Sequence, residues 1–179
     1  MRLQPSYNRS ILRGLFRTKK SLSIHIIKTT SKMDSAKLLL LATAALFWYA
    51  TGASWLLQYV AYPTYKLVNK DGFVPFHIAF GKRLLVATVI PMVLGNFCSF
   101  ILVFFHPDSS PVGLVYLVAI CSVVILFTTM KYEVPRHNKL DKVGKDDALI
   151  DGLVTDNAPR TASWTVGSLA LAYMIWQAL

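Results

Sequence analysis

The sequence predicts an all-α fold, a bundle of four transmembrane helices behind a basic N-terminal extension. The first observation is composition. Of the 179 residues, 54% are hydrophobic and 16% are charged, whereas about a quarter of the residues in an ordinary soluble domain are charged. The second observation is that the apolar residues come in long blocks. The third is that basic residues gather in front of those blocks.

Four stretches of the chain contain no Asp, Glu, Lys or Arg: residues 38–65, 84–107, 109–130 and 161–179. Because an α-helix rises about 1.5 Å per residue, roughly 20 apolar residues cross a hydrocarbon core of about 30 Å. A soluble helical bundle is the alternative, but it needs polar faces at the helical period, which these stretches mostly lack. We therefore expect a membrane domain at residues 34–179, with spans at about residues 38–62, 83–105, 112–131 and 160–178.

Residues 1–33 form a basic leader, which holds eight of the Lys and Arg residues and no acid. This composition, rich in Arg, Ser and Thr, is typical of an organellar transit peptide and predicts a mitochondrial or plastid inner membrane. A basic cytosolic tail, or translation from Met33, explains the same residues equally well. Since the leader carries most of the net charge of +10, nucleic-acid binding has no support in the rest of the chain, and the lipid bilayer is the expected partner.

The remaining Lys and Arg residues predict the topology. The segments that follow the first and third spans are basic, whereas residues 106–111 and the C-terminus carry no Lys or Arg. By the positive-inside rule, the basic segments face the side of insertion. Both termini then lie on the opposite side, provided that the leader is removed.

Prolines set the expected helix ends, because proline lacks an N–H and disturbs a helix interior. We expect a turn from Pro63 and a second span that starts near Pro75. Pro91 is expected to kink that span, and the third span is expected to end before Pro135.

The connection to the last span is expected to contain a separate short surface helix at residues 146–154. Pro159 suits the first turn of the last span, and Asn157 suits the cap in front of it.

A polar stripe follows the first span, since Thr51, Ser54, Gln58 and Tyr62 recur at spacings of three and four and share one helix face. Helix packing is the simpler explanation of the stripe. An unpaired amide in hydrocarbon costs several kcal/mol, however, so Gln58 needs a partner. Asn96, in the middle of the second span, is the expected one.

Two histidines, His77 and His137, lie near the basic ends of the second and third spans. Imidazoles there could bind a metal, ligate haem or move protons. The spacing shows no His pair at helical distance, no Cys pair and no carboxylate beside either His, so no metal is assigned and the cofactor is unknown. A structural role is the alternative.

Asn138 lies beside His137, and Arg160 lies at the start of the last span. Anionic lipid head groups would account for the cations of this region. The functional alternative is a polar pocket at the membrane border. The candidate pocket residues are Gln58, His77, Asn96, His137, Asn138 and Arg160.

One ordered series of residues from Trp48 to the C-terminus resembles a group of uncharacterised four-span membrane proteins found mainly in bacteria. The series is Gln58, Tyr62-Pro63, Phe76-His77, Val134-Pro135, His137-Asn138, Leu140, Leu153-Val154, Asn157, Arg160-Thr161 and Trp164. The resemblance implies a fold and no established activity. A more distant likeness, in the number of spans and in the Asn and Arg near the last span, is to the anthrone-oxygenase-like membrane proteins.

Two departures from that group bear on mechanism. Ala158 stands where the group often has Trp after the Asn, and an acidic residue expected in the second span is replaced near Gly95 or Asn96. An acid-dependent mechanism of the relatives is therefore in doubt here.

Two functions remain open. The first is a structural, assembly or small-molecule-binding component of the membrane, acting as a homo-oligomer or in a membrane complex. The alternative is a membrane oxidoreductase or oxygenase that acts on a lipophilic substrate such as a quinone or polyketide, with His77 and His137 as acid–base or ligand groups. The enzyme requires Gln58, both histidines, Asn138 and Arg160 to converge on one pocket, whereas the structural role lets them scatter.

Overall fold

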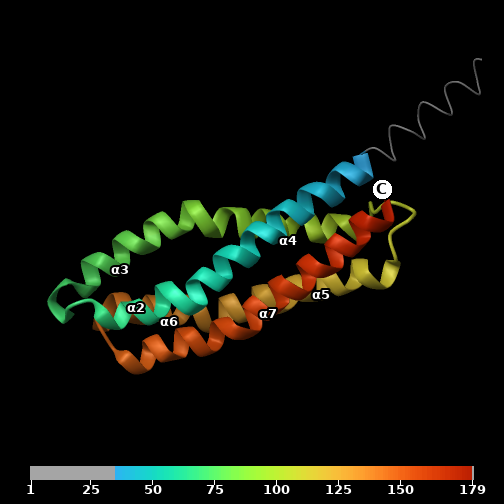
Figure 1. Ribbon diagram of the computed structural model, residues 1–179. Helices are drawn as coiled ribbons and strands as arrows, with labels where there is room; N and C mark the ends of the chain where they lie inside the picture. The colour runs from blue at the N-terminus through green and yellow to red at the C-terminus, as the bar shows by residue number, and fades with distance from the viewer. Residues whose placement is uncertain (1–34, 179) are drawn as a thin grey trace, which may run out of the picture.

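The computed structural model describes residues 35–178 (Figure 1). These residues form helices joined by short connections, with no strand among them, so the predicted all-α class is confirmed. The predicted leader, residues 1–33, lies outside the described residues.

Four long rods make up the bundle. The first helix, Ser35–Leu67, ends with η1 (Leu57–Ala61), α2 (Tyr62–Thr64) and η2 (Tyr65–Leu67). The second, Lys70–Leu102, consists of α3 (Lys70–Leu84), η3 (Leu85–Val89) and α4 (Ile90–Leu102). The third, Val112–Val143, consists of α5 (Val112–Thr128), η4 (Thr129–Glu133) and α6 (Val134–Val143). The fourth is α7 (Asp147–Ala178).

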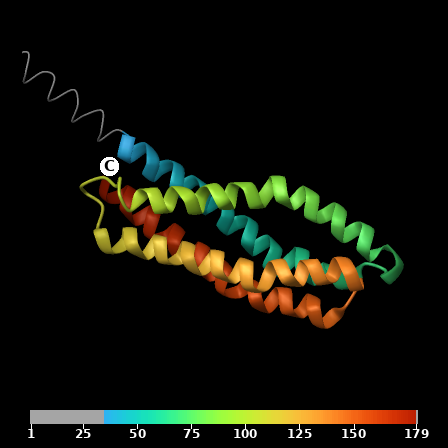
Figure 2. The same cartoon turned by 180° about the vertical axis from the view of Figure 1, so that it is seen from behind.

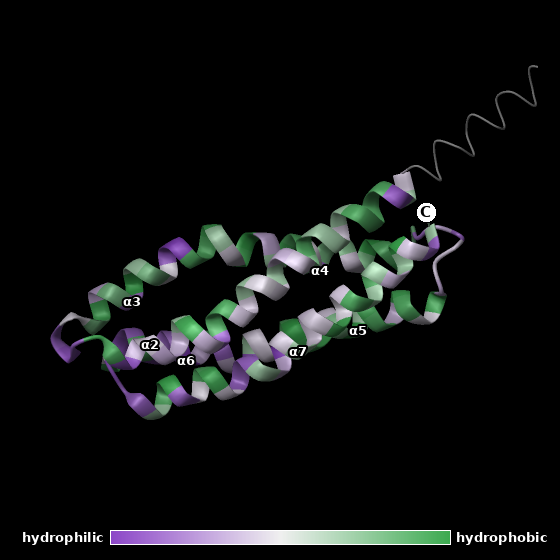
Figure 3. Cartoon of the chain, in the orientation of Figure 1, coloured by the Kyte–Doolittle hydropathy of each residue, from purple (hydrophilic) through white to green (hydrophobic). Residues whose placement is uncertain are grey.

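The four rods run antiparallel in sequence order. In Figures 1 and 2 the start of the first helix, the connection at residues 103–111 and the end of α7 lie at one end of the bundle. The connections at residues 68–69 and 144–146 lie at the other end, which we call the loop end. Figure 3 shows hydrophilic residues gathered toward the loop end.

Three helices, Ser35–Leu67, Lys70–Leu102 and Val112–Val143, are long and apolar enough to cross a membrane. The helix α7 is equally long but is not among them, because acids dilute its first half and hydroxyl groups its second. Those hydroxyl groups point largely into the protein. Thr51 Oγ1 lies 2.8 Å from Ser168 Oγ, and Ser54 Oγ lies 2.7 Å from Thr161 Oγ1.

Prolines do not end the helices at the expected places. Pro63, Pro91 and Pro135 each follow, by two residues, the end of a five-residue π turn, namely η1, η3 and η4. A proline ring crowds the carbonyl four residues earlier and leaves it without a donor, and a π turn widens the helix at that point. The predicted turn at Pro63 and the predicted end before Pro135 are therefore wrong. Pro75, expected at a helix start, lies inside α3.

The carbonyl that Pro91 leaves without a donor finds one in the neighbouring helix. The hydroxyl of Tyr49 donates a hydrogen bond to the carbonyl of Ala87, four residues before the proline. A side chain of the first helix thus replaces the missing backbone donor and links the first two helices.

The last helix is continuous, so the predicted separate helix at 146–154 and the predicted start at Pro159 are wrong. Its cap is Asp146, whose Oδ1 accepts a hydrogen bond from the Leu149 backbone N–H at 3.0 Å. Gly144, at a φ of 81°, ends α6 just before it. Asn157, expected as the cap, is fully buried within α7.

Two apolar cores hold the bundle together, one on each side of a polar layer. In the first core the rings of Phe47 and Trp164 meet edge to face with centroids 4.7 Å apart. The second core, nearer the loop end, is built from Leu57, Tyr62, Tyr65, Phe73, Leu140, Ile150 and Leu153. The candidate site lies beside the second core, to which its Tyr62 belongs.

Gly167 allows the first helix to approach α7 closely. A Cβ added there would lie 2.6 Å from Cε1 of Phe47, whose ring is fully buried and cannot move aside. We expect Gly167→Ala to lower the free energy of unfolding by about 1–3 kcal/mol through overpacking. Gly52→Ala is the matched control, since a Cβ there meets nothing within 4 Å.

Thermal unfolding of the two variants in detergent distinguishes the outcomes. Gly52→Ala should be neutral or slightly stabilising, because alanine favours helix. Equal midpoints for the two variants would contradict the close approach at Gly167.

Candidate functional site

A cavity of about 510 Å³ opens between the second and third helices. Residues of all three π turns line it, among them Leu57 from η1, Thr88 from η3 and Glu133 from η4. π turns inside α-helices often occur at functional sites. The three turns widen their helices around one space and so help to create it.

The mouth and the floor of the cavity differ in polarity. Apolar side chains at the mouth are substantially exposed, among them Leu85 at 52% and Val89 at 39%. The floor is polar, and its members Tyr62, Glu133 and Arg160 are 6% exposed or less. Such a cavity suits a molecule with an apolar body and one polar end.

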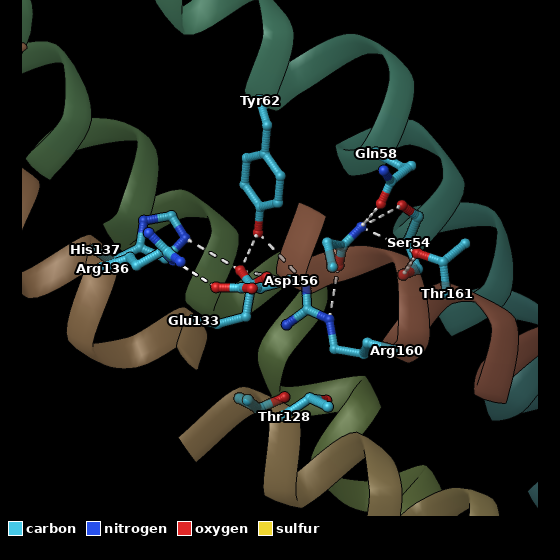
Figure 4. A network of polar contacts seen from close by, with 12 residues as sticks. Ser54, Gln58, Tyr62, Thr128, Glu133, Arg136, His137, Asp156, Arg160 and Thr161 are labelled. Atoms are coloured by element: carbon cyan, nitrogen blue, oxygen red, sulfur yellow. Dashed lines mark hydrogen bonds and ion pairs between the residues drawn. The ribbon is translucent and has the colours of Figure 1, made fainter. Parts of the chain in front are cut away.

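Glu133 lies among Tyr62, His137 and Arg160 in a network of polar contacts (Figure 4), and it lines the cavity. Its Oε2 accepts a hydrogen bond from the Tyr62 hydroxyl at 3.0 Å and lies 3.9 Å from Nη2 of Arg160. Nη2 of Arg160 also donates to the Tyr62 hydroxyl at 3.4 Å. A buried ion pair of this kind has lost its hydration, so each charge depends on the other and on these hydrogen bonds.

Arg160 is held in place from its own helix. Its Nε donates to Oδ1 of Asn157 at 2.8 Å, and Nδ2 of Asn157 donates to Oε1 of Gln58 at 2.7 Å. The Gln58 amide in turn donates to the Val154 carbonyl at 2.9 Å. The network therefore joins the first helix, α7 and the ion pair of the cavity floor.

The two histidines meet at the side of the cavity. Nε2 of His77 lies 2.9 Å from Nδ1 of His137, and the ring planes are inclined by 22° with centroids 5.1 Å apart, so the two imidazoles meet edge to edge. On its other side, Nδ1 of His77 lies 2.6 Å from Oδ1 of Asp141. The Tyr65 ring stands nearly perpendicular to the His77 ring, with the ring centroids 5.4 Å apart. His77 is buried on all sides, whereas His137 keeps about a quarter of its side chain exposed.

The structure brings His77, His137, Asn138 and Arg160 to this one cavity. Gln58 lies outside it, in a separate groove of about 340 Å³ between the first helix and α7. It reaches the cavity floor only through Asn157 and Arg160.

Asn96 belongs to neither space, and the predicted pairing of Gln58 with Asn96 is wrong. Nδ2 of Asn96 donates to the Met92 carbonyl of its own helix at 2.8 Å. The neighbouring Gly95 packs against Phe47 of the first helix, so Asn96 lies at about the depth of Phe47. Phe47 is about 16 Å from Gln58 along that helix, at 1.5 Å per residue. The amides lie at different depths and cannot meet.

Sequence reasoning missed Glu133 and Asp141, which give both histidines a carboxylate neighbour. Nε2 of His137 lies 3.8 Å from Oε2 of Glu133, and His77 contacts Asp141. The statement that no carboxylate lies beside either His is therefore wrong. The signal was available, since Glu133, His137 and Asp141 follow one another at intervals of four and share a helix face.

No group of three or more His, Cys, Asp or Glu side chains within residues 35–178 is arranged to hold a metal ion. Cys98 and Cys121 are both free thiols.

Comparisons of the chain with protein-family models, with curated proteins and with solved structures found no match. The resemblance to uncharacterised four-span proteins, and the distant one to anthrone-oxygenase-like proteins, therefore stay predictions from the sequence. The site is interpreted from its own geometry.

The buried ion pair makes a specific prediction about stability. We expect Arg160→Met to lower the free energy of unfolding by about 3–5 kcal/mol, because it leaves the Glu133 carboxylate buried without its counter-charge. The double variant Arg160→Met with Glu133→Gln should regain much of that loss, since it removes the unpaired charge.

Lys66→Met is the control, because it breaks the ion pair of Lys66 with Asp151, whose side chains are 37% and 64% exposed. An exposed pair is worth about 0–1 kcal/mol. Chemical unfolding in detergent measures all four proteins. A double variant no more stable than Arg160→Met would contradict the pairing.

Proposed function

We propose that the protein is a four-span membrane protein that binds a small lipophilic molecule in the cavity between its second and third helices. The observation that carries this proposal is the polarity of the cavity. An apolar mouth at Leu85 and Val89 leads to a buried charged floor at Glu133 and Arg160. A lipophile would enter from the apolar face of the bundle and place its polar end on the floor.

The fourth span of this proposal is α7. Its Thr161 and Ser168 are buried and hydrogen-bond to the first helix, so its polar groups need not face lipid. Its 32 residues exceed the roughly 20 that a crossing requires.

The proposed topology places the loop end on the side of insertion and both termini of the membrane domain on the other side. Three observations support it: the basic residues near the loop end, the antiparallel order of the rods, and the absence of Lys and Arg from residues 106–111. Residues 1–33, read as a transit peptide, would direct the protein to a mitochondrial or plastid inner membrane and then be removed.

Two substitutions on the second helix test the cavity. Val89 is at its mouth, whereas Val93, one turn further and 54% exposed, is not among the lining residues. With an anthracene-labelled fatty acid as the probe and the full chain in nanodiscs, we expect Val89→Trp to weaken binding at least about tenfold, which corresponds to 1.4 kcal/mol. Val93→Trp should bind as the wild type does.

Fluorescence titration gives the dissociation constants. Equal affinity of both tryptophan variants and the wild type would mean that the probe binds elsewhere, and the cavity would lose its proposed role.

The second candidate is a membrane oxidoreductase or oxygenase acting on a lipophilic substrate. The meeting of His77 and His137 in the same cavity as Asn138 and Arg160 favours it. As an enzyme, the protein would use the histidines as acid–base or ligand groups.

An absorption spectrum and metal analysis of the purified full chain test the ligand role. A stoichiometric haem or metal that disappears from the His77→Ala, His137→Ala double variant would make the redox function the leading one. A colourless, metal-free wild type would leave lipophile binding as the proposed function.

A further inference from the structure

One oxygen of the cavity floor has no hydrogen-bond partner among the described residues. Glu133 is 2% exposed, and its Oε1 is buried without a donor, although Oε2 is well supplied. An unpaired carboxylate oxygen in a buried site is costly unless the carboxyl group is protonated or the oxygen accepts a hydrogen bond from a bound molecule. Glu133 is therefore placed to exchange protons.

A chain of polar contacts leads from this carboxyl to the loop-end surface. Oε2 of Glu133 lies 3.8 Å from Nε2 of His137, beyond hydrogen-bond distance, so proton transfer there requires the carboxyl group to rotate toward the imidazole. Nδ1 of His137 lies 2.9 Å from Nε2 of His77, and Nδ1 of His77 lies 2.6 Å from Oδ1 of Asp141. Asp141 is 40% exposed, so the chain ends in water. Its two ends are about 12 Å apart along the third helix, at 1.5 Å per residue.

The positions of the hydrogen atoms along this series of contacts follow from a count of its protons. Three gaps join the four groups, and each gap needs one proton. When both imidazoles are neutral and both carboxyls are ionised, His77 donates to Asp141 and His137 donates to His77. The lone pair on Nε2 of His137 then faces the Glu133 carboxylate. The gap at Glu133 is filled only when one more proton enters the chain.

Other charged and titratable groups surround Glu133 without interrupting the chain. The guanidinium of Arg160 and the hydroxyl of Tyr62 face it from α7 and α2. Arg136, the neighbour of His137 on α6, is already paired with Asp156 of α7. Among the described carboxylates near the site, only Glu133 has a buried oxygen without a hydrogen-bond partner.

We propose that Asp141, His77 and His137 form a proton-exchange path between water at the loop end and Glu133 in the cavity floor. The path does not depend on the proposed lipophile, which would meet Glu133 from the cavity side. It gives the site the means to take up or release a proton without opening the cavity to water.

The outward transfer balances as three concerted or successive steps. The proton on Oε2 of Glu133 leaves that oxygen and bonds to Nε2 of His137, the Nδ1 proton of His137 bonds to Nε2 of His77, and the Nδ1 proton of His77 bonds to Oδ1 of Asp141. At each step one bond to hydrogen forms and one breaks. The net result is one proton fewer on Glu133 and one more on Asp141, and the reverse sequence reprotonates Glu133.

The test is a proton jump on the full chain in nanodiscs, with a photolabile caged proton as the source and time-resolved infrared detection. The carbonyl band of the protonated carboxyl is assigned to Glu133 by its absence from Glu133→Gln. We expect His137→Gln and Asp141→Asn to slow the appearance of this band at least about tenfold, a conservative threshold because a positioned proton donor typically contributes about 100-fold or more.

The control is His106→Gln, which removes an imidazole whose contact is the Pro107 carbonyl, far from the path; its rate should equal the wild-type rate. Free imidazole should restore the rate of His137→Gly, which a purely structural histidine would not allow. Equal rates in wild type, His137→Gln and Asp141→Asn would overturn the path, as would the absence of a protonated Glu133 band. If the His137 variants fail to fold, Asp141→Asn at the exposed end decides. None of these outcomes depends on probe binding, which the tryptophan variants test separately.

Discussion

The structure depends on the buried pair of Glu133 and Arg160. Both side chains have left water, so each charge must be compensated inside the protein. Tyr62 supplies a hydrogen bond to the carboxylate, and Asn157 fixes the guanidinium and connects it to Gln58. The pair therefore sets how the first helix, the third helix and α7 lie relative to one another. The same pair forms the floor of the cavity, which makes stability and the candidate site inseparable.

The prolines have a related part in the architecture. Pro63, Pro91 and Pro135 each leave a carbonyl without its helical donor, and a π turn precedes each of them. A π turn widens the helix, and the widened segments of three helices line one cavity. At Ala87, whose carbonyl loses its helical donor because of Pro91, the hydroxyl of Tyr49 replaces the missing N–H. Bundle packing thus keeps the helices continuous, and the local irregularity leaves a cavity between them.

Much of this architecture can be predicted from the sequence, and each incorrect prediction has a physical cause. Long charge-free stretches predicted apolar helices, and composition predicted an all-α chain. The predicted helix ends are wrong because proline does not terminate these helices. Packed membrane helices accommodate proline through π turns. The predicted Gln58–Asn96 pair is wrong because the two amides, although chemically suited to each other, lie at different depths along the helices. Glu133 was overlooked because it falls just outside an uncharged stretch, although its spacing of four from His137 put both on one face. The contact between His77 and His137 joins two helices, and no pattern within either helix encodes it.

The proposed function requires a lipophile in the cavity between the second and third helices, with its polar end on Glu133 and Arg160. Photo-crosslinking tests it most directly, with a photoreactive amino acid at Ile78 in the cavity lining and, for comparison, at Phe97, which is exposed on α4 outside it. Mass spectrometry of the captured molecules should find one small lipophile enriched at position 78 and absent from position 97. Capture of the same bulk phospholipids at both positions would contradict the claim.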